Sequence, residues 1–175
     1  MLVLVVGPSG AGKDTLLEAA RQVLAGDSRF RFVRRVITRP ADAGGESHEA
    51  VSEAEFLTRD FALQWQAHGL RYGIPEESIE DGRVVVANVS RTVIAEAARC
   101  FPTRVIEVTA SPGTLASRLS SRGREGEADV ATRLSRSVAM PSGVMTETVV
   151  NDGSLKDGVD QFLAALIRAA ADVAR

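Results

Sequence analysis

The residues best suited to chemistry stand in the string GPSGAGKDT at 7–15. Its three glycines allow a tight turn in which successive backbone N–H groups point at phosphate oxygens. Lys13 adds a mobile positive charge for the β- and γ-phosphates of a nucleotide, and the spacing GxxxxGK is that of a P-loop. The residues expected to hold these phosphates are Gly7, Pro8, Ser9, Gly10, Ala11, Gly12, Lys13, Asp14 and Thr15.

Asp14 departs from the P-loop pattern, because a Ser or Thr hydroxyl usually binds Mg²⁺ at this position. A carboxylate is at least as good a ligand for this hard cation, although it adds negative charge beside the β-phosphate. Asp14 is therefore the candidate metal ligand. Thr15 stays an alternative, with its hydroxyl as the ligand, if the start of the following helix is shifted by one residue.

The segments around this turn have the patterns that a P-loop requires. Residues 2–6 form an unbroken apolar run, which predicts a strand buried on both faces. Apolar residues then recur at helical spacing over 13–25, and a helix start carries a positive dipole end. A plain glycine turn could also join a strand to a helix, but this order of elements favours phosphate binding.

Composition narrows the class of protein. The 175 residues are 45% hydrophobic, enough for one domain with a sizeable core, and the net charge of −2 gives no basic field for nucleic acid. Because Met1 leads directly into a short strand, we expect no signal peptide and a cytoplasmic protein with no membrane partner. Its partner would be a small-molecule substrate, and a homodimer is left open. Cys100, the single cysteine, is expected in a helix, buried or half-buried.

Strand-like and helix-like segments alternate along the chain, which favours an α/β fold with a central parallel five-stranded sheet. Ligands of such sheets sit at the carboxyl ends of the strands. Ser90, Ser111 and a terminal amphipathic run after Leu155 mark helices. The expected strands of the sheet are 2–6, 30–38, 84–87, 104–109 and 148–150.

Two stretches interrupt this alternation. The first, about 39–80, contains a capping box at Ser52 and Glu55 and a half-buried strand over 61–67. The second, about 120–135, is small and charged and predicts a lid. We therefore expect a single P-loop kinase domain over 1–175, with a substrate-binding insertion and a short lid that excludes water during phosphoryl transfer.

Arginines flank both interruptions. Arg122 and Arg133 bracket the expected lid, and their guanidinium forks suit the charge that develops on a transferring phosphoryl group. With Lys13 they are the candidate catalytic residues. Arg118 and Arg136 fit a solvated helix face equally well.

A second group, Arg34, Arg35 and Arg39, lies on or beside the second expected strand, where one extended face would hold Arg31, Arg35 and Arg39. These cations repel one another in an empty protein, and a polyanionic substrate would relieve that repulsion. The insertion adds three polar candidates for substrate contact, His48, His68 and Tyr72, none of them at metal-ligand spacing.

The chain resembles the guanylate-kinase branch of the P-loop kinases over almost its whole length. The matching motifs are GPSGAGKD at 7–14, ITRP at 37–40, GLRYG at 69–73, RLSSRGRE at 118–125, RL at 133–134 and VVND at 149–152. Within that branch it most resembles the ribose 1,5-bisphosphate phosphokinase family of phosphonate utilisation, in the GKD ending, TRPADAGGESH at 38–48 and WQAHGLRYGIP at 65–75. The resemblance implies ATP and Mg²⁺ as cofactors and transfer to ribose 1,5-bisphosphate. The substrate-binding residues that it implies are Arg35, Arg39, His48, His68 and Tyr72.

Departures from guanylate kinases agree with a substrate that lacks a base. The segment PADAGG has no second phosphate-binding arginine, and the position of the base-reading glutamate falls on or near Leu63. Asn88 stands where those enzymes place an aspartate near the metal, so Asp14 would take more of the metal binding. The alternatives are a nucleoside monophosphate kinase and a non-catalytic guanylate-kinase-like binding module, which the intact P-loop with Lys13 opposes.

Overall fold

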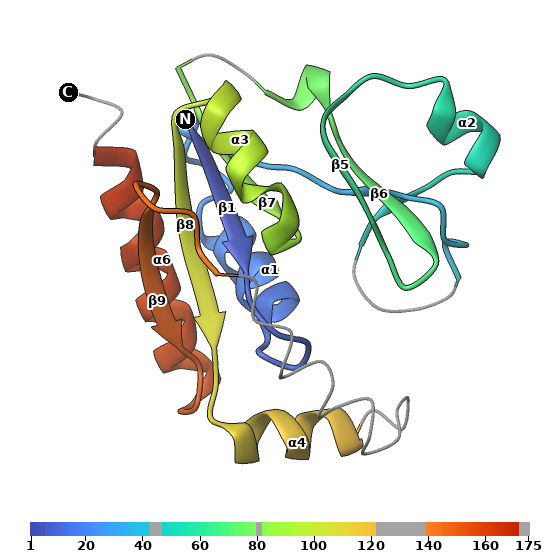
Figure 1. Ribbon diagram of the computed structural model, residues 1–175. Coiled ribbons are helices and arrows are strands. Elements are labelled where there is room, and N and C mark those ends of the chain that lie inside the picture. Colours follow the sequence, from blue (N-terminus) through green and yellow to red (C-terminus); the bar gives the residue numbers. More distant parts are fainter. Residues whose placement is uncertain (43–46, 80–81, 122–138, 172–175) are drawn as a thin grey trace.

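The unbroken apolar run at the start of the chain forms the innermost strand, β1, in the computed structural model (Figure 1). The structure describes residues 1–42, 47–79, 82–121 and 139–171. In chain order the elements are β1 (Leu2–Val6), α1 (Lys13–Val23), β2 (Phe30–Phe32), β3 (Val36–Ile37), β4 (Glu49–Ala50), α2 (Glu53–Leu57), β5 (Phe61–Ala67), β6 (Leu70–Pro75), η1 (Glu76–Ser78), β7 (Val84–Asn88), η2 (Arg91–Val93), α3 (Ile94–Cys100), β8 (Thr103–Thr109), α4 (Pro112–Ser121), β9 (Met145–Val150) and α6 (Leu155–Ala171).

The central sheet contains five parallel strands in the order β2-β7-β1-β8-β9, which confirms the predicted fold class. Strand β1 pairs with β7 on one side and β8 on the other, and Val5 lies level with Asn88 and Ile106. Every residue of β1 is buried, as expected for a strand that is paired on both edges and covered on both faces. Its carboxyl end leads directly into the glycine turn.

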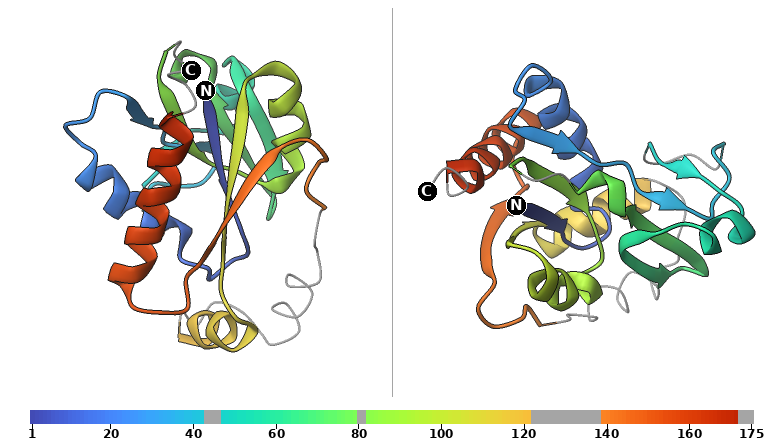
Figure 2. Two further views of the ribbon diagram at one scale, coloured as in Figure 1. Left: turned by 90° about the vertical axis from the view of Figure 1, so that its left-hand side faces the viewer. Right: turned by 90° about the horizontal axis from the view of Figure 1, so that it is seen from above.

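Alternate side chains of β1 build two separate cores. Val3 and Val5 pack with α1 and α6 on one face of the sheet, through residues such as Leu16 and Phe162. Leu2, Leu4 and Val6 pack on the other face, with α3 and with a second sheet. Figure 2 shows α1 and α6 on one side of the central sheet and α3 on the other.

The second sheet has the strand order β4-β3-β6-β5 and lies beside the central sheet (Figure 1). Strands β5 and β6 form an antiparallel hairpin whose turn holds His68 and Gly69, both at positive φ, as a two-residue hairpin turn requires. The predicted strand over 61–67 is confirmed as β5. The predicted capping box is confirmed at the start of α2, where Ser52 accepts from the backbone N–H of Glu55.

The prediction of one strand over 30–38 is wrong. Residues 30–32 form β2 in the central sheet, and the chain then leaves that sheet so that Val36 can pair with Gly73 as β3 of the second sheet. Arg31, Arg35 and Arg39 therefore do not share one extended face. The apolar residues of this run are buried as the alternation suggests, but Phe30 packs in the core with α1 and α6, and Ile37 packs in the core with α3 and the second sheet.

Cys100 also differs from its prediction, because this thiol is exposed at the last position of α3. Among the residues that the structure describes, no helix has the length and apolar character needed to cross a bilayer.

Candidate active site

The glycine turn after β1 has a backbone that only glycine adopts easily. Gly10 and Gly12 have φ angles of 84° and 91°, and Gly7 has a φ of 147°. A Cβ at Gly7 would also overlap the carbonyl of Val108 on β8, so the turn is pressed against the neighbouring strand. Helix α1 begins at Lys13 as predicted, with Gly12 as its N-cap residue.

The Lys13 ammonium folds back over this turn. Its Nζ donates to the carbonyl oxygens of Gly7, at 2.8 Å, and Pro8, at 3.0 Å. The cation is thus held at the mouth of a loop whose N–H groups and helix start already favour an anion. This is the geometry of a phosphate cradle.

The Asn151 side chain supports the glycine turn by a hydrogen bond to its backbone. Its side-chain Nδ2 donates to the carbonyl of Ala11 at 2.8 Å, and its backbone N–H donates to Thr109 at 2.7 Å. The side chain is only 5% exposed and lies so close to Gly12 that a Cβ there would be 2.5 Å from Nδ2. Gly158 of α6 also leaves room for it, since a Cβ at 158 would overlap its Oδ1.

Arg118 of α4 completes this support. Its guanidinium donates to the carbonyl of Asn151 at 2.9 Å and lies 3.4 Å from the carbonyl of Gly10. The sequence predicts Arg118 as a solvated or lid residue and Asn151 only as part of the VVND motif, because each contacts the glycine turn across more than 100 positions. Together with Thr15 and Leu155, both residues line a cavity of about 320 Å³.

A larger cavity, of about 1100 Å³, lies between α1 and the segment that leaves β2. One wall carries Asp14 and Asn88, and another carries Arg34 and Arg35. Negative and positive groups thus face the same space beside the glycine turn. A phosphorylated ligand together with a cation suits this combination of charges.

The wall with Asp14 fits a hard cation. Asn88 Nδ2 donates to Asp14 Oδ1 at 2.9 Å, while Asn88 Oδ1 is buried and has no hydrogen-bond partner among the described residues. Carboxylate and amide oxygens are ligands that Mg²⁺ accepts. No group of three His, Cys, Asp or Glu side chains within the described ranges could hold a metal by itself.

The wall with Arg35 is built on a pair of aromatic rings. The Arg35 guanidinium lies over the Tyr72 ring at 5.3 Å, and Trp65 stacks on that ring with centroids 5.4 Å apart and planes 8° apart. The cation–π contact and the stack fix the arginine from one side. Tyr72 and Trp65 are both buried, in the core between the two sheets.

Arg39 and His48 form a second basic group. Arg39 Nη2 lies 3.4 Å from His48 Nδ1, and His48 Nε2 lies 3.2 Å from the Arg39 carbonyl. Arg39 Nε is buried and has no hydrogen-bond partner among the described residues. A buried donor of this kind is costly unless a ligand satisfies it.

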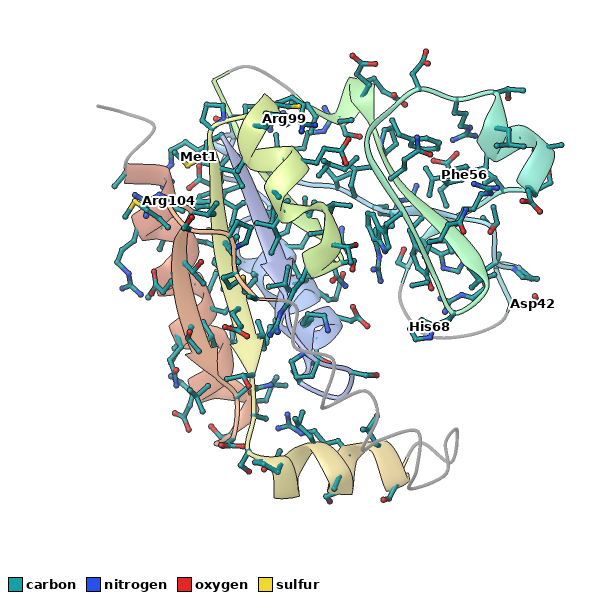
Figure 3. The ribbon with its side chains drawn as sticks, viewed as in Figure 1. Met1, Asp42, Phe56, His68, Arg99 and Arg104 are labelled. Carbon is teal, nitrogen blue, oxygen red and sulfur yellow. The ribbon has the colours of Figure 1, made fainter. Side chains whose placement is uncertain are left out.

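The other predicted site residues lie elsewhere. His68 is exposed at the tip of the β5–β6 hairpin and borders neither cavity (Figure 3). Leu63, at or near the expected base-reading position, is buried in the core and 1% exposed. Arg122 and Arg133 fall outside the described residues.

Asp152 follows Asn151 and holds the start of α4. Its Oδ1 accepts the backbone N–H of Ser111 at 2.8 Å, and this bond, with a smaller contribution from Thr114, lowers the pKa of the carboxyl. The bond is therefore complete above the ordinary value of 3.8 and is lost only as the pH falls through the lower folded pKa. At neutral pH the carboxylate anchors α4 next to the glycine turn.

The contact between Asn151 and the turn predicts a stability effect. Asn151→Ala leaves the buried Ala11 carbonyl with only the long contact from Arg118 Nη1, at 3.5 Å, and we expect the free energy of unfolding to fall by about 1–3 kcal/mol. Urea denaturation measures this change. Asn151→Asp is the matched control, because it keeps the size of the side chain but places a carboxylate oxygen against the Ala11 carbonyl oxygen. At pH 7 it should lower the free energy of unfolding more than Asn151→Ala does. A fall of less than about 0.5 kcal/mol for the alanine variant would show that Asn151 does not support the turn.

Comparisons with known proteins agree with this geometry. The family described as "AAA domain" matches residues 2–141. The ribose 1,5-bisphosphate phosphokinase PhnN of Brucella melitensis biotype 2 is 47% identical over 170 residues, covering 92% of this chain and 88% of that protein. A bifunctional ribose 1,5-bisphosphokinase-thymidine phosphorylase of Azorhizobium caulinodans is 46% identical over 95% of this chain, which spans only 25% of its length.

Among solved structures, a guanylate kinase from Anaplasma phagocytophilum superposes with a TM-score of 0.63 at 20% identity, covering 97% of this chain and 84% of that one. At that identity the likeness shows a shared fold. The match to the Brucella protein goes further, because it holds 47% identity over most of both chains. This chain belongs to the ribose 1,5-bisphosphate phosphokinase family.

Proposed function

We propose that this chain transfers the γ-phosphoryl group of ATP to the 1-phosphate of α-D-ribose 1,5-bisphosphate. The products are ADP and 5-phospho-α-D-ribose 1-diphosphate, a step in phosphonate catabolism. The observation that carries the proposal is the match to a phosphokinase of that name over 88% of its length, with the phosphate cradle intact.

The glycine turn and Lys13 would hold the ATP phosphates. The nucleoside would extend toward the smaller cavity, where Arg118, Asn151 and Thr15 are brought together and Asp152 lies next in the chain. Asp14, which accepts a hydrogen bond from Asn88, would hold Mg²⁺, and the bound ion would neutralise charge on the β- and γ-phosphates. The protein's part is to position these groups before transfer.

The acceptor would occupy the larger cavity. A phosphate monoester is already anionic, so this transfer needs orientation and charge neutralisation rather than a strong general base. Arg34 and Arg35 line the cavity, and Arg39 offers a buried donor nearby in the chain. These arginines, with His48 and Tyr72, are the proposed contacts of the two sugar phosphates. His68 borders neither cavity and is not among them.

Two features oppose a nucleotide acceptor. Leu63 lies in the core, where it neither reaches a ligand nor accepts a hydrogen bond from a base. The Tyr72 ring is covered by Arg35 on one side and Trp65 stacks on it, so the aromatic surface is already in use. A site that lacks hydrogen-bond partners for a base discriminates against it strongly.

The proposed organisation is one P-loop kinase domain over 1–175. Residues of about 39–80 serve as its substrate-binding insertion, and residues of about 120–135 serve as its lid. Arg122 and Arg133 would cover the transferring group when the lid closes, and such arginines stabilise the transition state.

An acceptor comparison tests the proposal. ADP release is measured with ribose 1,5-bisphosphate, GMP and gluconate in parallel, and we expect turnover with the first alone. Lys13→Ala should lose at least about a hundredfold in kcat, since it removes a cation from the transferring phosphates. Turnover on GMP alone would refute the proposal, and no turnover on any acceptor would favour a binding module.

Arg35 offers a sharper test of the acceptor site. Arg35→Gln keeps a polar side chain but removes the charge, and charge-assisted hydrogen bonds contribute about 1.5–3 kcal/mol. We expect KM for ribose 1,5-bisphosphate to rise about tenfold or more, with KM for ATP unchanged. Arg99→Gln is the matched control, because Arg99 is exposed on α3 and borders neither cavity (Figure 3). Equal changes in both KM values for Arg35→Gln would place this arginine outside the acceptor site.

A further inference from the structure

Asp14 and Asn88 meet although 74 positions separate them in the chain. Asn88 is the last residue of β7 and lies level with Val5, just before the glycine turn. Asp14 is in the first turn of α1. The parallel pairing of β1 and β7 therefore delivers the amide to the carboxylate, and both border the larger cavity.

The hydrogen bond between them sets the orientation of the amide. Asn88 Nδ2 donates to Asp14 Oδ1 at 2.9 Å, and the reversed amide would bring an oxygen against the carboxylate. Asn88 Oδ1 is consequently left without a partner among the described residues, in a side chain that is 7% exposed. An unmet buried acceptor is costly, so the contact to Asp14 must outweigh that cost in fixing the amide.

We propose that Asn88 is a positioning residue for a metal-binding carboxylate carried by Asp14. The inference rests on the proposed function, which supplies the Mg²⁺-nucleotide. The charge that binds the ion stands on the helix at Asp14, and the strand residue Asn88 orients it.

An amide at 88 suits this role better than a second carboxylate. Two carboxylates 2.9 Å apart repel each other, whereas the amide donates to Asp14 and leaves its charge in place. Mg²⁺ commonly binds through one or two carboxylates, phosphate oxygens and several waters. One ionised carboxylate with an oriented amide meets that need without a larger protein cage.

The test exchanges the two groups. The double variant Asp14→Asn with Asn88→Asp keeps the total charge and the shape of the pair nearly unchanged. Its carboxylate stands on strand β7 instead of helix α1. Asp14→Asn alone and Asn88→Ala alone are the single changes. Ser78→Ala is the matched control, because Ser78 is a buried polar residue that borders neither cavity.

The readout is the Mn²⁺ affinity of each protein in complex with a non-hydrolysable ATP analogue, followed by the electron paramagnetic resonance signal of free Mn²⁺. We expect Asn88→Ala to weaken Mn²⁺ binding about 10–100-fold, the usual effect of losing a residue that orients a metal ligand. Asp14→Asn should weaken it at least as much, and the double exchange should bind Mn²⁺ more tightly than Asp14→Asn alone. Affinity for the analogue in EDTA should stay unchanged in Asn88→Ala.

Three results would overturn the inference: unchanged Mn²⁺ affinity in Asn88→Ala, an equal loss of analogue binding in EDTA, or a double exchange no better than Asp14→Asn. These outcomes are separable from the acceptor test. If Mn²⁺ affinities change as expected but ribose 1,5-bisphosphate is not phosphorylated, the metal inference holds and the proposed function fails. If the bisphosphate is phosphorylated and Mn²⁺ affinities do not change, the proposed function holds and the metal inference fails.

Discussion

The hydrogen bond from the buried Asn151 amide to the Ala11 carbonyl is the contact on which the phosphate cradle depends. A glycine turn is adaptable because its residues tolerate positive φ, and that same freedom would let an unsupported turn collapse or fray. The Asn151 hydrogen bond limits this conformational freedom of the turn. Arg118 in turn donates to the Asn151 carbonyl and approaches the Gly10 carbonyl. The N–H groups of the turn and the start of α1 are thereby left to face an anion.

The parallel sheet explains how distant residues arrive at this turn. Strands β7, β1, β8 and β9 run in one direction, so Asn88, Gly7 and Asn151 all fall at or just beyond their carboxyl ends. Because β1 is the central strand, the glycine turn lies between Asn88 and Asn151. Asn88 then supports Asp14 on one side, and Asn151 supports Ala11 on the other. Tyr72 and Trp65 of the second sheet hold Arg35, which gives the cavity shared with Asp14 a positive group.

Local patterns predicted much of this structure. The apolar run, the glycine spacing and the helical period identified β1, the turn and α1, and the capping box at Ser52 was correct in detail. Features that depend on tertiary packing could not be predicted from these local patterns. The alternating run over 30–38 could not reveal that its halves join different sheets, and helical spacing could not show that Cys100 ends up exposed.

The site shows the same division. The turn residues were visible as a motif, but the supporting role of Arg118 depends on a contact across more than 100 residues, which no local pattern records. The orientation of Asn88 is likewise invisible in a string of buried strand residues. The resemblance already linked Asn88 to Asp14, but the contact between their side chains depends on the strand register that places Asn88 beside the glycine turn.

The central claim is that the acceptor is a phosphate rather than a hydroxyl group, and ³¹P nuclear magnetic resonance of the reaction tests it directly. With ATP, Mg²⁺ and ribose 1,5-bisphosphate, the account predicts a new pair of mutually split signals from a diphosphate on the sugar, together with those of ADP and an unchanged 5-phosphate. A new monoester signal, or inorganic phosphate beside intact ribose 1,5-bisphosphate, would contradict the account.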